Sequence, residues 1–564
     1  MCDADHSDEG TLTPDIAHLY TAAAARELDA RLIAREASSE GAFAVMERAA
    51  AAMFRHLQRR WPTANHLRIF CGPGNNGGDG YVIAGLASTL GWAAHVVQVG
   101  DTARATAETR RALAFAQEAG ATVQPFAEYL RQKTDAAPDV IVDALLGTGF
   151  RGTAEGDFAS AIEHINGCGA PVLAADVPSG LSADTGSRSG PAVRAQLTVT
   201  VVACKQGLFT GQAADHVGAV AYEPLVEPDG WVQAGCHQVP VTARLVSADL
   251  LSLWMPRRQR TSHKGHFGQV LVVGGDLGMG GAPLMAAQAA ARAGAGKVVL
   301  MSRSAHVAAM LARQPEVMTQ AVDDVAAAAE IISAQVSSAS VVVLGPGLGQ
   351  SAWSRALFAQ VLRAVSKSPA ALVVDADGLN LLAENLSTTL ASFDARRRAQ
   401  WILTPHPGEA ARLLGCSTGE VEADRFAAVR RLRDMTGAQC LLKGAGSLMA
   451  FSASGQSASG SLDVGKNAET SNTTSVVEIC ADGNPGMASG GMGDVLAGLA
   501  GGLLAQRFTA VEALRIAVCV HARAGDMAVS KTGEQGLLAS DLYPELMTLW
   551  AGLATAGTVT EDLG

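Results

Sequence analysis

The sequence lacks the features that direct a chain to a membrane, to nucleic acid or into secretion. No apolar stretch among its 564 residues is long enough to span a bilayer, and the acidic start, residues 1–5, has no positive or apolar signal region. No basic run interleaved with aromatic residues offsets the formal net charge of -11. We therefore expect a cytoplasmic protein with neither nucleic acid nor membrane as a partner.

Cysteine is scarce and unpatterned. The nine cysteines form no CxxC pair and show no metal-ligand spacing, and their odd number argues against a complete disulfide framework. Reduced, mostly buried thiols are expected. The 48% hydrophobic content is typical of a globular protein, and 61 glycines indicate many tight turns and loops that approach phosphate. The length exceeds what one hydrophobic core usually organises, which favours two domains.

Short apolar strands alternate with helices in the first half, which predicts a parallel sheet covered on both faces. One helical segment is expected over about 20–61. Strands are expected at 67–71, 94–99, 140–146, 171–175 and 197–202, and helices at 81–90 and 106–119.

The alternation of apolar strands with helices is interrupted at 226–245 by Pro, Gly and polar residues, and it resumes after that segment. We therefore place two domains at 15–235 and 240–555. Strands of the second are expected at 269–273, 297–301, 340–344, 371–374, 401–404 and 439–442. The segment 452–475, rich in Ser, Gly, Thr and Asn, is expected to be a mobile surface insert.

Three loops at the ends of strands carry the chemistry of the first half. Residues 72–80, Gly-Pro-Gly-Asn-Asn-Gly-Gly-Asp-Gly, open a helix, where exposed amides bind phosphate well. Asp143 and Asp176 each end a strand, where ligands of open α/β sheets lie, although such an aspartate alone is more often a cap or turn former. These three loops are expected to share one crevice.

Together these loops resemble the YjeF N-terminal domain, the NAD(P)HX epimerase family, over residues 20–225. The resemblance implies a Rossmann-like doubly wound fold and a potassium ion held by Asn76, Asp143 and Ser179. Oxygen ligands of these kinds suit a hard cation. Asp176 is the candidate acid and base, an effect worth on the order of 100- to 10,000-fold. The residues implied to bind the hydrated dinucleotide are Asn75, Asn76, Gly77, Gly78, Asp79, Gly147, Thr148, Gly149, Phe150, Arg151, Gly152, Thr153 and Asp176.

In the second half, residues 490–498, Gly-Gly-Met-Gly-Asp-Val-Leu-Ala-Gly, lead into an apolar helix. The small residues expose backbone amides as an anion hole, and Asp494 would lie beside the anion as a base; alone, an aspartate at a helix start is as often a cap. This element resembles the ribokinase-like superfamily. The strings at 344–349, 375–380, 403–409 and 442–446 narrow the resemblance to the YjeF C-terminal domain, the ADP- or ATP-dependent NAD(P)HX dehydratase.

That resemblance implies roles for further residues. Ala282, Gly347, His406 and Asp494 would contact the hydrated dinucleotide. Asp494 would activate the ring hydroxyl to accept phosphoryl from ADP or ATP, with Mg²⁺ present. Met492 stands where the family usually has threonine, which removes a hydroxyl but leaves the backbone amide. The residues implied to bind the nucleotide are Lys443, Gly444, Ala445, Gly446, Ser447 and Gly493.

The function expected is bifunctional repair of NADHX and NADPHX: epimerisation of the R and S forms, then dehydration of the S form, in a homo-oligomer. The alternative is a ribokinase-like small-molecule kinase, of the hydroxymethylpyrimidine type, with a non-catalytic N-terminal binding domain. The N-terminal half disfavours that kinase reading. A non-enzymatic reading, in which the N-terminal domain is a binding scaffold, is disfavoured by the intact Asn-Asn-Gly-Gly-Asp loop at 75–79, the acidic net charge and the fused dehydratase-like half.

Overall fold

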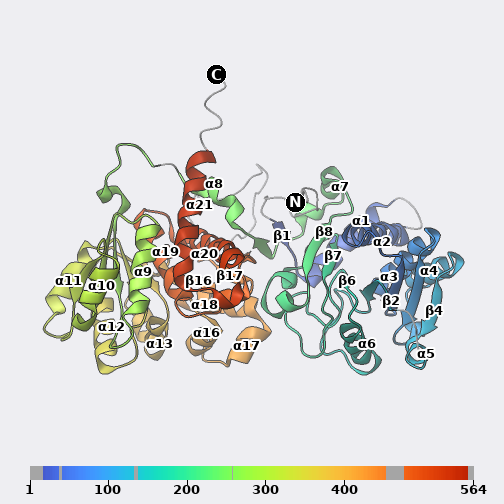
Figure 1. Cartoon of the computed structure of the whole chain (residues 1–564), viewed down its shortest axis with the longest axis horizontal. Coiled ribbons are helices and arrows are strands. Elements are labelled where there is room, and N and C mark those ends of the chain that lie inside the picture. Colours follow the sequence, from blue (N-terminus) through green and yellow to red (C-terminus); the bar gives the residue numbers. More distant parts are fainter. Residues whose placement is uncertain (1–16, 37–40, 133–136, 257, 453–475, 557–564) are drawn as a thin grey trace, which may run out of the picture. The chain divides into compact units, whose positions relative to one another are not determined.

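The structure, a computed structural model, describes residues 17–36, 41–132, 137–256, 258–452 and 476–556. The chain divides between Arg244 and Leu245 into two compact units (Figure 1). Each unit is built on its own largely parallel sheet, so the predicted α/β class is confirmed. The insert expected at 452–475 lies, apart from Ser452, outside the described residues.

The first unit contains a seven-stranded sheet of order β4-β3-β2-β5-β6-β7-β8 in which all neighbours are parallel. Because the order reverses between β2 and β5, a crevice opens at their carboxyl ends. The strands are β2 (His66–Cys71), β3 (Ala93–Gln98), β4 (Thr122–Pro125), β5 (Val140–Ala144), β6 (Val172–Ala175), β7 (Leu197–Val201) and β8 (Ala219–Glu223).

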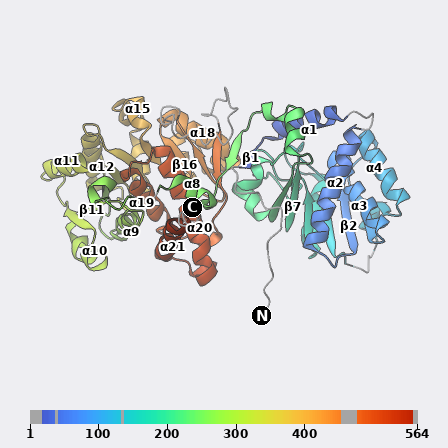
Figure 2. The same ribbon diagram turned by 90° about the horizontal axis from the view of Figure 1, so that it is seen from above.

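Helices cover both faces of this sheet (Figure 2). They are α1 (Ala22–Arg35), α2 (Gly41–Arg60), α3 (Asn75–Thr89), α4 (Ala107–Glu118), α5 (Phe126–Tyr129), α6 (Gly156–Gly167) and α7 (Pro228–Gln233). Helices α2, α3 and α4 pack on the face that presents Ile69 and Val142, and α5 and α6 pack on the face of Phe70 and Ile141. Burial on both faces explains the continuous apolar strand sequences.

Two helix predictions were wrong in their bounds. The segment expected as one helix over 20–61 forms α1 and α2, and α1 ends at Arg35 with an extended Glu36. Helix α3 begins at Asn75 rather than near Tyr81, with Gly74 as its N-cap. The Asn-Asn-Gly-Gly-Asp sequence is therefore the first turn of a helix, and glycine is tolerated there because α3 packs closely on its neighbours.

In the second unit the strands lie in the order β18-β17-β16-β15-β14-β13-β10-β11-β12. Pairing is parallel from β16 to β12 and antiparallel from β16 through β17 to β18. The strands are β10 (Gln269–Val273), β11 (Lys297–Ser302), β12 (Met318–Ala321), β13 (Val341–Leu344), β14 (Ala371–Val374), β15 (Trp401–Leu403), β16 (Gln439–Leu442), β17 (Ser447–Ala450) and β18 (Val477–Cys480). Two further short strands of the chain are β1 (Ala17–Leu19), within the first unit, and β9 (Ala243–Leu245), where the chain passes from one unit to the next.

Helices α9, α19 and α20 form the main hydrophobic core with one face of this sheet, through residues such as Val270 and Val343. The alternate residues, including Leu271 and Val342, are also fully buried, so the other face is covered as well. The helices are α8 (Leu251–Trp254), α9 (Gly281–Arg292), α10 (Val307–Arg313), α11 (Ala329–Ser338), α12 (Ala352–Val365), α13 (Asp377–Glu384), α14 (Leu386–Ala391), α15 (Ala395–Arg398), α16 (Pro407–Leu414), α17 (Thr418–Ala423), α18 (Arg425–Thr436), α19 (Met492–Ala505), α20 (Ala510–Thr532) and α21 (Leu542–Ala556).

Within the described ranges no helix combines the length and apolar character needed to cross a membrane. The cysteines described there carry free thiols, and most are buried.

Candidate functional site

The carboxyl ends of the strands in the first unit border a cavity of about 570 Å³. Three loops meet there: the start of α3, the chain after β5 and the chain after β6. The residues of the predicted site that line the cavity are Asn75, Asn76, Asp79, Gly147, Thr148, Gly149, Phe150 and Asp176. A cavity of this size accommodates a nicotinamide nucleotide ring.

Other predicted residues lie outside the cavity lining. Gly77 and Gly78 are buried where α3 packs closely on its neighbours, since a Cβ on Gly77 would lie 1.9 Å from the carbonyl oxygen of Gly72. Arg151 forms an ion pair with Asp184 at 3.0 Å and hydrogen-bonds the carbonyl of Phe150. The structure thus separates residues that face the cavity from Gly77, Gly78, Arg151, Gly152 and Thr153.

Asp176 is held firmly at the floor of this cavity. It is 9% exposed and has a φ of 66°, a left-handed conformation that side-chain-bearing residues rarely adopt. Thr148 donates to Oδ2, whereas Lys205 and Thr200 donate to Oδ1, the latter at 3.1 Å. One of these donors is the buried ammonium of Lys205, and both oxygens of Asp176 are held in place by partners.

Two cavity residues that the sequence analysis missed are Lys205 and Asp29. Lys205 is 3% exposed and lies shortly after β7. Asp29 interrupts the apolar stripe of α1 that includes Ala25 and Leu32, and a carboxylate at helical spacing within such a stripe is a signal that would have revealed it. Burial raises the pKa of Asp29 to about 6, and Lys205 opposes that rise.

The three residues predicted to hold a cation are Asn76, which lines the cavity, and Asp143 and Ser179, which contact each other. Ser179 donates from its hydroxyl to Oδ1 of Asp143 at 2.6 Å and from its amide to Oδ2 at 2.8 Å. Burial raises the pKa of Asp143 to about 6. Both polar side-chain atoms of Asn76 are buried without a hydrogen-bond partner, next to Gly147. A buried carboxylate and an unsatisfied carboxamide are donors of the kinds that suit a monovalent cation.

In the second unit Asp494, Gly493, Lys443 and Asp375 converge. Lys443 follows β16, and its Nζ donates to Oδ1 of Asp375 at 2.7 Å. A Cβ built on Gly493 would lie 3.2 Å from that Nζ and 3.3 Å from Oδ2 of Asp375. Burial, reinforced by Asp375, raises the pKa of Asp494 to about 7. A carboxyl with such a pKa can take up a proton near neutrality.

The turn before α19, which the sequence predicts to be an anion hole, contains Gly490 and Gly491, and Gly491 is the N-cap of the helix. Gly491 has a φ of 96°, and a Cβ there would lie 2.7 Å from the side chain of Met285. Met492 is the first residue of α19, and its side chain joins the hydrophobic core. The Met492 side chain therefore offers no hydroxyl to the site.

His406 is an exposed N-cap of α16. Its Nδ1 accepts a hydrogen bond from the amide of Gly408 at 3.0 Å, and its own amide donates to Glu409 at 2.8 Å. Glu409 lies 3.9 Å from Nζ of Lys443, and burial raises its pKa to about 7. Asp375 and Glu409 are charged site residues that the sequence analysis did not single out, although both lie in the strings it quoted.

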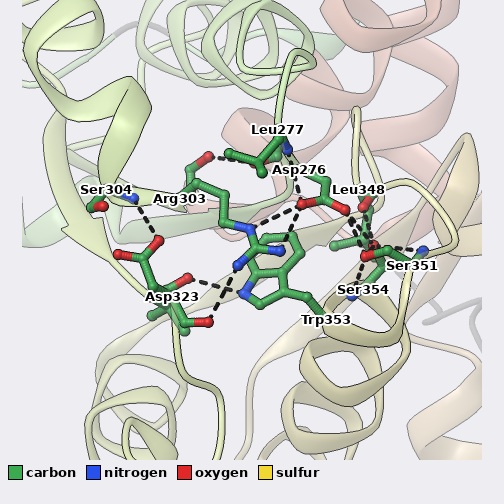
Figure 3. Close-up of polar contacts among 12 residues, drawn as sticks. Asp276, Leu277, Arg303, Ser304, Asp323, Leu348, Ser351, Trp353 and Ser354 are labelled. Carbon is green, nitrogen blue, oxygen red and sulfur yellow. Dashed lines mark hydrogen bonds and ion pairs between the residues drawn. The ribbon is translucent and has the colours of Figure 1, made fainter.

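Ala282, in the first turn of α9, and Gly347, in the loop after β13, face each other, since a Cβ on Gly347 would lie 3.1 Å from that of Ala282. Figure 3 shows the network behind them. The Asp276 amide donates to the carbonyl of Gly347 at 2.8 Å, and its carboxylate accepts from Arg303 at 2.9 Å and Ser351 at 2.6 Å. This network joins the loop after β10 to the loop after β13.

Arg303 stacks over the ring of Trp353, 4.1 Å from its centroid. The partners of Asp276 lower its pKa despite burial, so the carboxylate stays charged. Farther along the sheet, Arg425 donates to the carbonyl of Lys443 at 3.1 Å and packs against Gly444, where the predicted nucleotide loop at 443–447 begins.

Comparisons with known proteins cover both units. Residues 42–207 match the family model of the YjeF-related protein N-terminus, and residues 270–547 match that of NAD(P)H-hydrate dehydratase. A solved ribokinase-like superfamily protein from Enterococcus faecalis is 25% identical, with a TM-score of 0.45, and aligns with 55% of this chain and 95% of its own.

Two curated relatives are similar over almost their whole length. The bifunctional NAD(P)H-hydrate repair enzyme of Coxiella burnetii is 40% identical over 531 residues, 94% of this chain and 99% of the relative. The enzyme of the same name from Escherichia coli is 36% identical over 507 residues, 90% of this chain and 89% of the relative. The chain belongs to the family of bifunctional NAD(P)H-hydrate repair enzymes.

Proposed function

We propose that the chain repairs hydrated NADH and NADPH in two steps. The first unit epimerises the R and S forms of NAD(P)HX, and the second dehydrates the S form at the expense of ADP or ATP. The observation that carries this proposal is that each unit has a carboxylate near the ends of its strands. In the first unit Asp176 lines a cavity, and in the second Asp494 lies near Lys443. The relatives of the same name span both units, which disfavours the kinase alternative with a non-catalytic N-terminal domain.

In NAD(P)HX the added hydroxyl lies on the ring carbon beside the ring nitrogen. The nitrogen lone pair assists cleavage of the C–O bond, and water returns to either face of the ring. Each direction requires a proton on the departing oxygen and a base for the incoming water. Asp176, fixed by three donors at the cavity floor, serves as the base.

Asn76, Asp143 and Ser179 would hold a potassium ion. The unsatisfied polar atoms of Asn76 and the buried Asp143 carboxylate support this assignment. The ion would supply positive charge beside a phosphate or hydroxyl of the substrate. The roles of Asn75, Asp79, Gly147, Thr148, Gly149 and Phe150 in binding the dinucleotide rest on their place in the cavity lining.

In the second unit Asp494 would remove the proton of the ring hydroxyl, whose oxygen then attacks the terminal phosphoryl group of the nucleotide. The amides of the turn before α19 and the ammonium of Lys443 would balance the charge that develops on that group. Phosphate then departs with the ring oxygen, and loss of a proton from the adjacent carbon restores the double bond. Mg²⁺ would arrive bound to the nucleotide phosphates.

The remaining expectations stay predictions: domain limits at 15–235 and 240–555, contact of Ala282, Gly347 and His406 with the substrate, a homo-oligomeric state and a cytoplasmic location.

Purified protein tests the proposal with separated epimers of NADHX. With ADP or ATP, absorbance at 340 nm should show NADH formed from both epimers. Asp494→Asn should abolish NADH formation but leave interconversion of the epimers, and Asp176→Asn should block conversion of the R form alone. If neither epimer yields NADH while a pyrimidine alcohol is phosphorylated, the kinase alternative holds.

A further inference from the structure

The cavity of the first unit contains two aspartates in opposite situations, Asp176 and Asp29. Both oxygens of Asp176 accept hydrogen bonds, and one of the donors is the ammonium of Lys205. Asp29 projects from α1, and no hydrogen bond or ion pair to another described residue holds its carboxyl. One carboxyl is therefore held by three donors, and the other lines the cavity without a donor of its own in the part of the chain that the structure describes.

We propose that Asp29 is the proton donor of this site and Asp176 its partner base. This assignment rests on the proposed epimerase function. It deepens that function by dividing the acid and base roles between two residues from different elements, α1 and the loop after β6.

The step balances as follows. Asp29 gives its proton to the ring hydroxyl as the C–O bond breaks, and the ring nitrogen supplies the electron pair that forms the iminium ion. Water adds to the opposite face of that carbon and gives a proton to Asp176. The Lys205 ammonium, which donates to Asp176, returns a proton to Asp29 and takes one from Asp176, restoring the starting state.

The charges around Asp29 support this division. Burial and the neighbouring Asp176 raise the pKa of Asp29 to about 6, and Lys205 lowers it. Asp79 is a poorer donor, because burial together with Asp176 and Asp29 raises its pKa far above the usual range, which favours a permanently neutral carboxyl. The titratable and charged groups that face Asp29 across the cavity are Arg26, Asp79, Glu108, Asp176 and Lys205.

The full-length chain can report both reactions in one assay. With ADP present, NADH from the R epimer requires epimerisation, whereas NADH from the S epimer requires dehydration alone. Asp29→Asn should slow conversion of the R epimer about 100-fold, the usual scale of a general acid, and leave conversion of the S epimer unchanged. Glu27→Gln, on the same helix but outside the cavity lining, is the matched control and should convert both at the wild-type rate.

The pH profile separates a proton donor from a packing residue. The wild-type epimerisation rate should fall as pH rises through the pKa of Asp29, and Asp29→Asn should remove this limb while Asp29→Glu retains it. In H₂¹⁸O, wild type should incorporate label into the ring hydroxyl as it epimerises. Asp29→Asn should slow incorporation of the label and epimerisation by the same factor. Conversion of the R epimer at the wild-type rate by Asp29→Asn, or an unchanged pH limb, overturns the inference. Failure of wild type to convert the R epimer while it converts the S epimer overturns the proposed epimerase function instead.

Discussion

The ammonium of Lys443 donates a 2.7 Å hydrogen bond to Asp375, a carboxylate whose side chain is 1% exposed. Lys443→Ala should therefore both weaken nucleotide binding and leave a buried carboxylate without its cation, which costs about 3 kcal/mol of unfolding free energy. Denaturant unfolding and the KM for ADP measure the two effects. Adding Asp375→Asn should recover much of the stability but not the KM; equal recovery of both would contradict the nucleotide role.

The dehydration rate should rise with pH through about 7. Burial raises the pKa of Asp494 to about 7, and a base acts only when ionised. The kcat for the S epimer between pH 5.5 and 8.5 tests this dependence. Glu409, which also has a pKa of about 7, is the control. Glu409→Gln should keep the rise of kcat with pH, whereas Asp494→Asn should lose the activity altogether. If the rise of kcat with pH disappears in Glu409→Gln, Glu409 rather than Asp494 is the group that titrates.

The same carboxyl should make stability depend on pH. Between the usual pKa of 3.8 and about 7, folded Asp494 keeps a proton that the unfolded chain releases, so stability is lost as pH rises through that window. Asp494→Asn has no charge to bury. We expect the Tm of this variant to exceed that of wild type at pH 8 and to approach it at pH 4, as scanning calorimetry would show. A Tm difference independent of pH would indicate that Asp494 is not buried as a titrating group.

Asp276→Ala should raise the KM for NADHX about tenfold or more with little effect on the KM for ADP. The network in Figure 3 joins Asp276 to the loop of Gly347, and its loss frees a loop that we place against the dinucleotide. When the loop is disordered in the free enzyme, ordering it on binding reduces the free energy of substrate binding. Steady-state kinetics with each substrate varied in turn provide the test. Arg303→Lys keeps the charge but loses the two-point contact with Asp276. Its KM for NADHX should lie between that of wild type and that of Asp276→Ala.

Replacing potassium with lithium should slow conversion of the R epimer but not that of the S epimer in the coupled assay. The cation assignment rests on the unsatisfied carboxamide of Asn76 beside buried Asp143. Asn76→Ala should abolish the difference between the ions, because it removes a ligand and leaves the fold of the second unit untouched. Epimerisation that proceeds equally well in both salts would show that no specific cation takes part.

Much of the fold could be predicted from the sequence because central parallel strands are buried on both faces and read as apolar runs. The edge strands β4 and β12 were missed for the opposite reason: neither contains a fully buried residue, and their sequences are mixed. The break between α1 and α2 was missed because helical spacing continues through alanine-rich chain on both sides. Asp29 was missed because a single carboxylate among the apolar positions of a helix is weak evidence for a site residue.

Local sequence patterns were enough to predict two α/β units, the loops at their strand ends and the family that those loops resemble, since burial pattern and glycine spacing are local properties. Which carboxylates share a cavity, and which groups surround each of them, became apparent only in the folded chain. Asp29, Asp176 and Lys205 are far apart along the chain, and the pKa of Asp29 is raised by burial among neighbours that folding alone brings together.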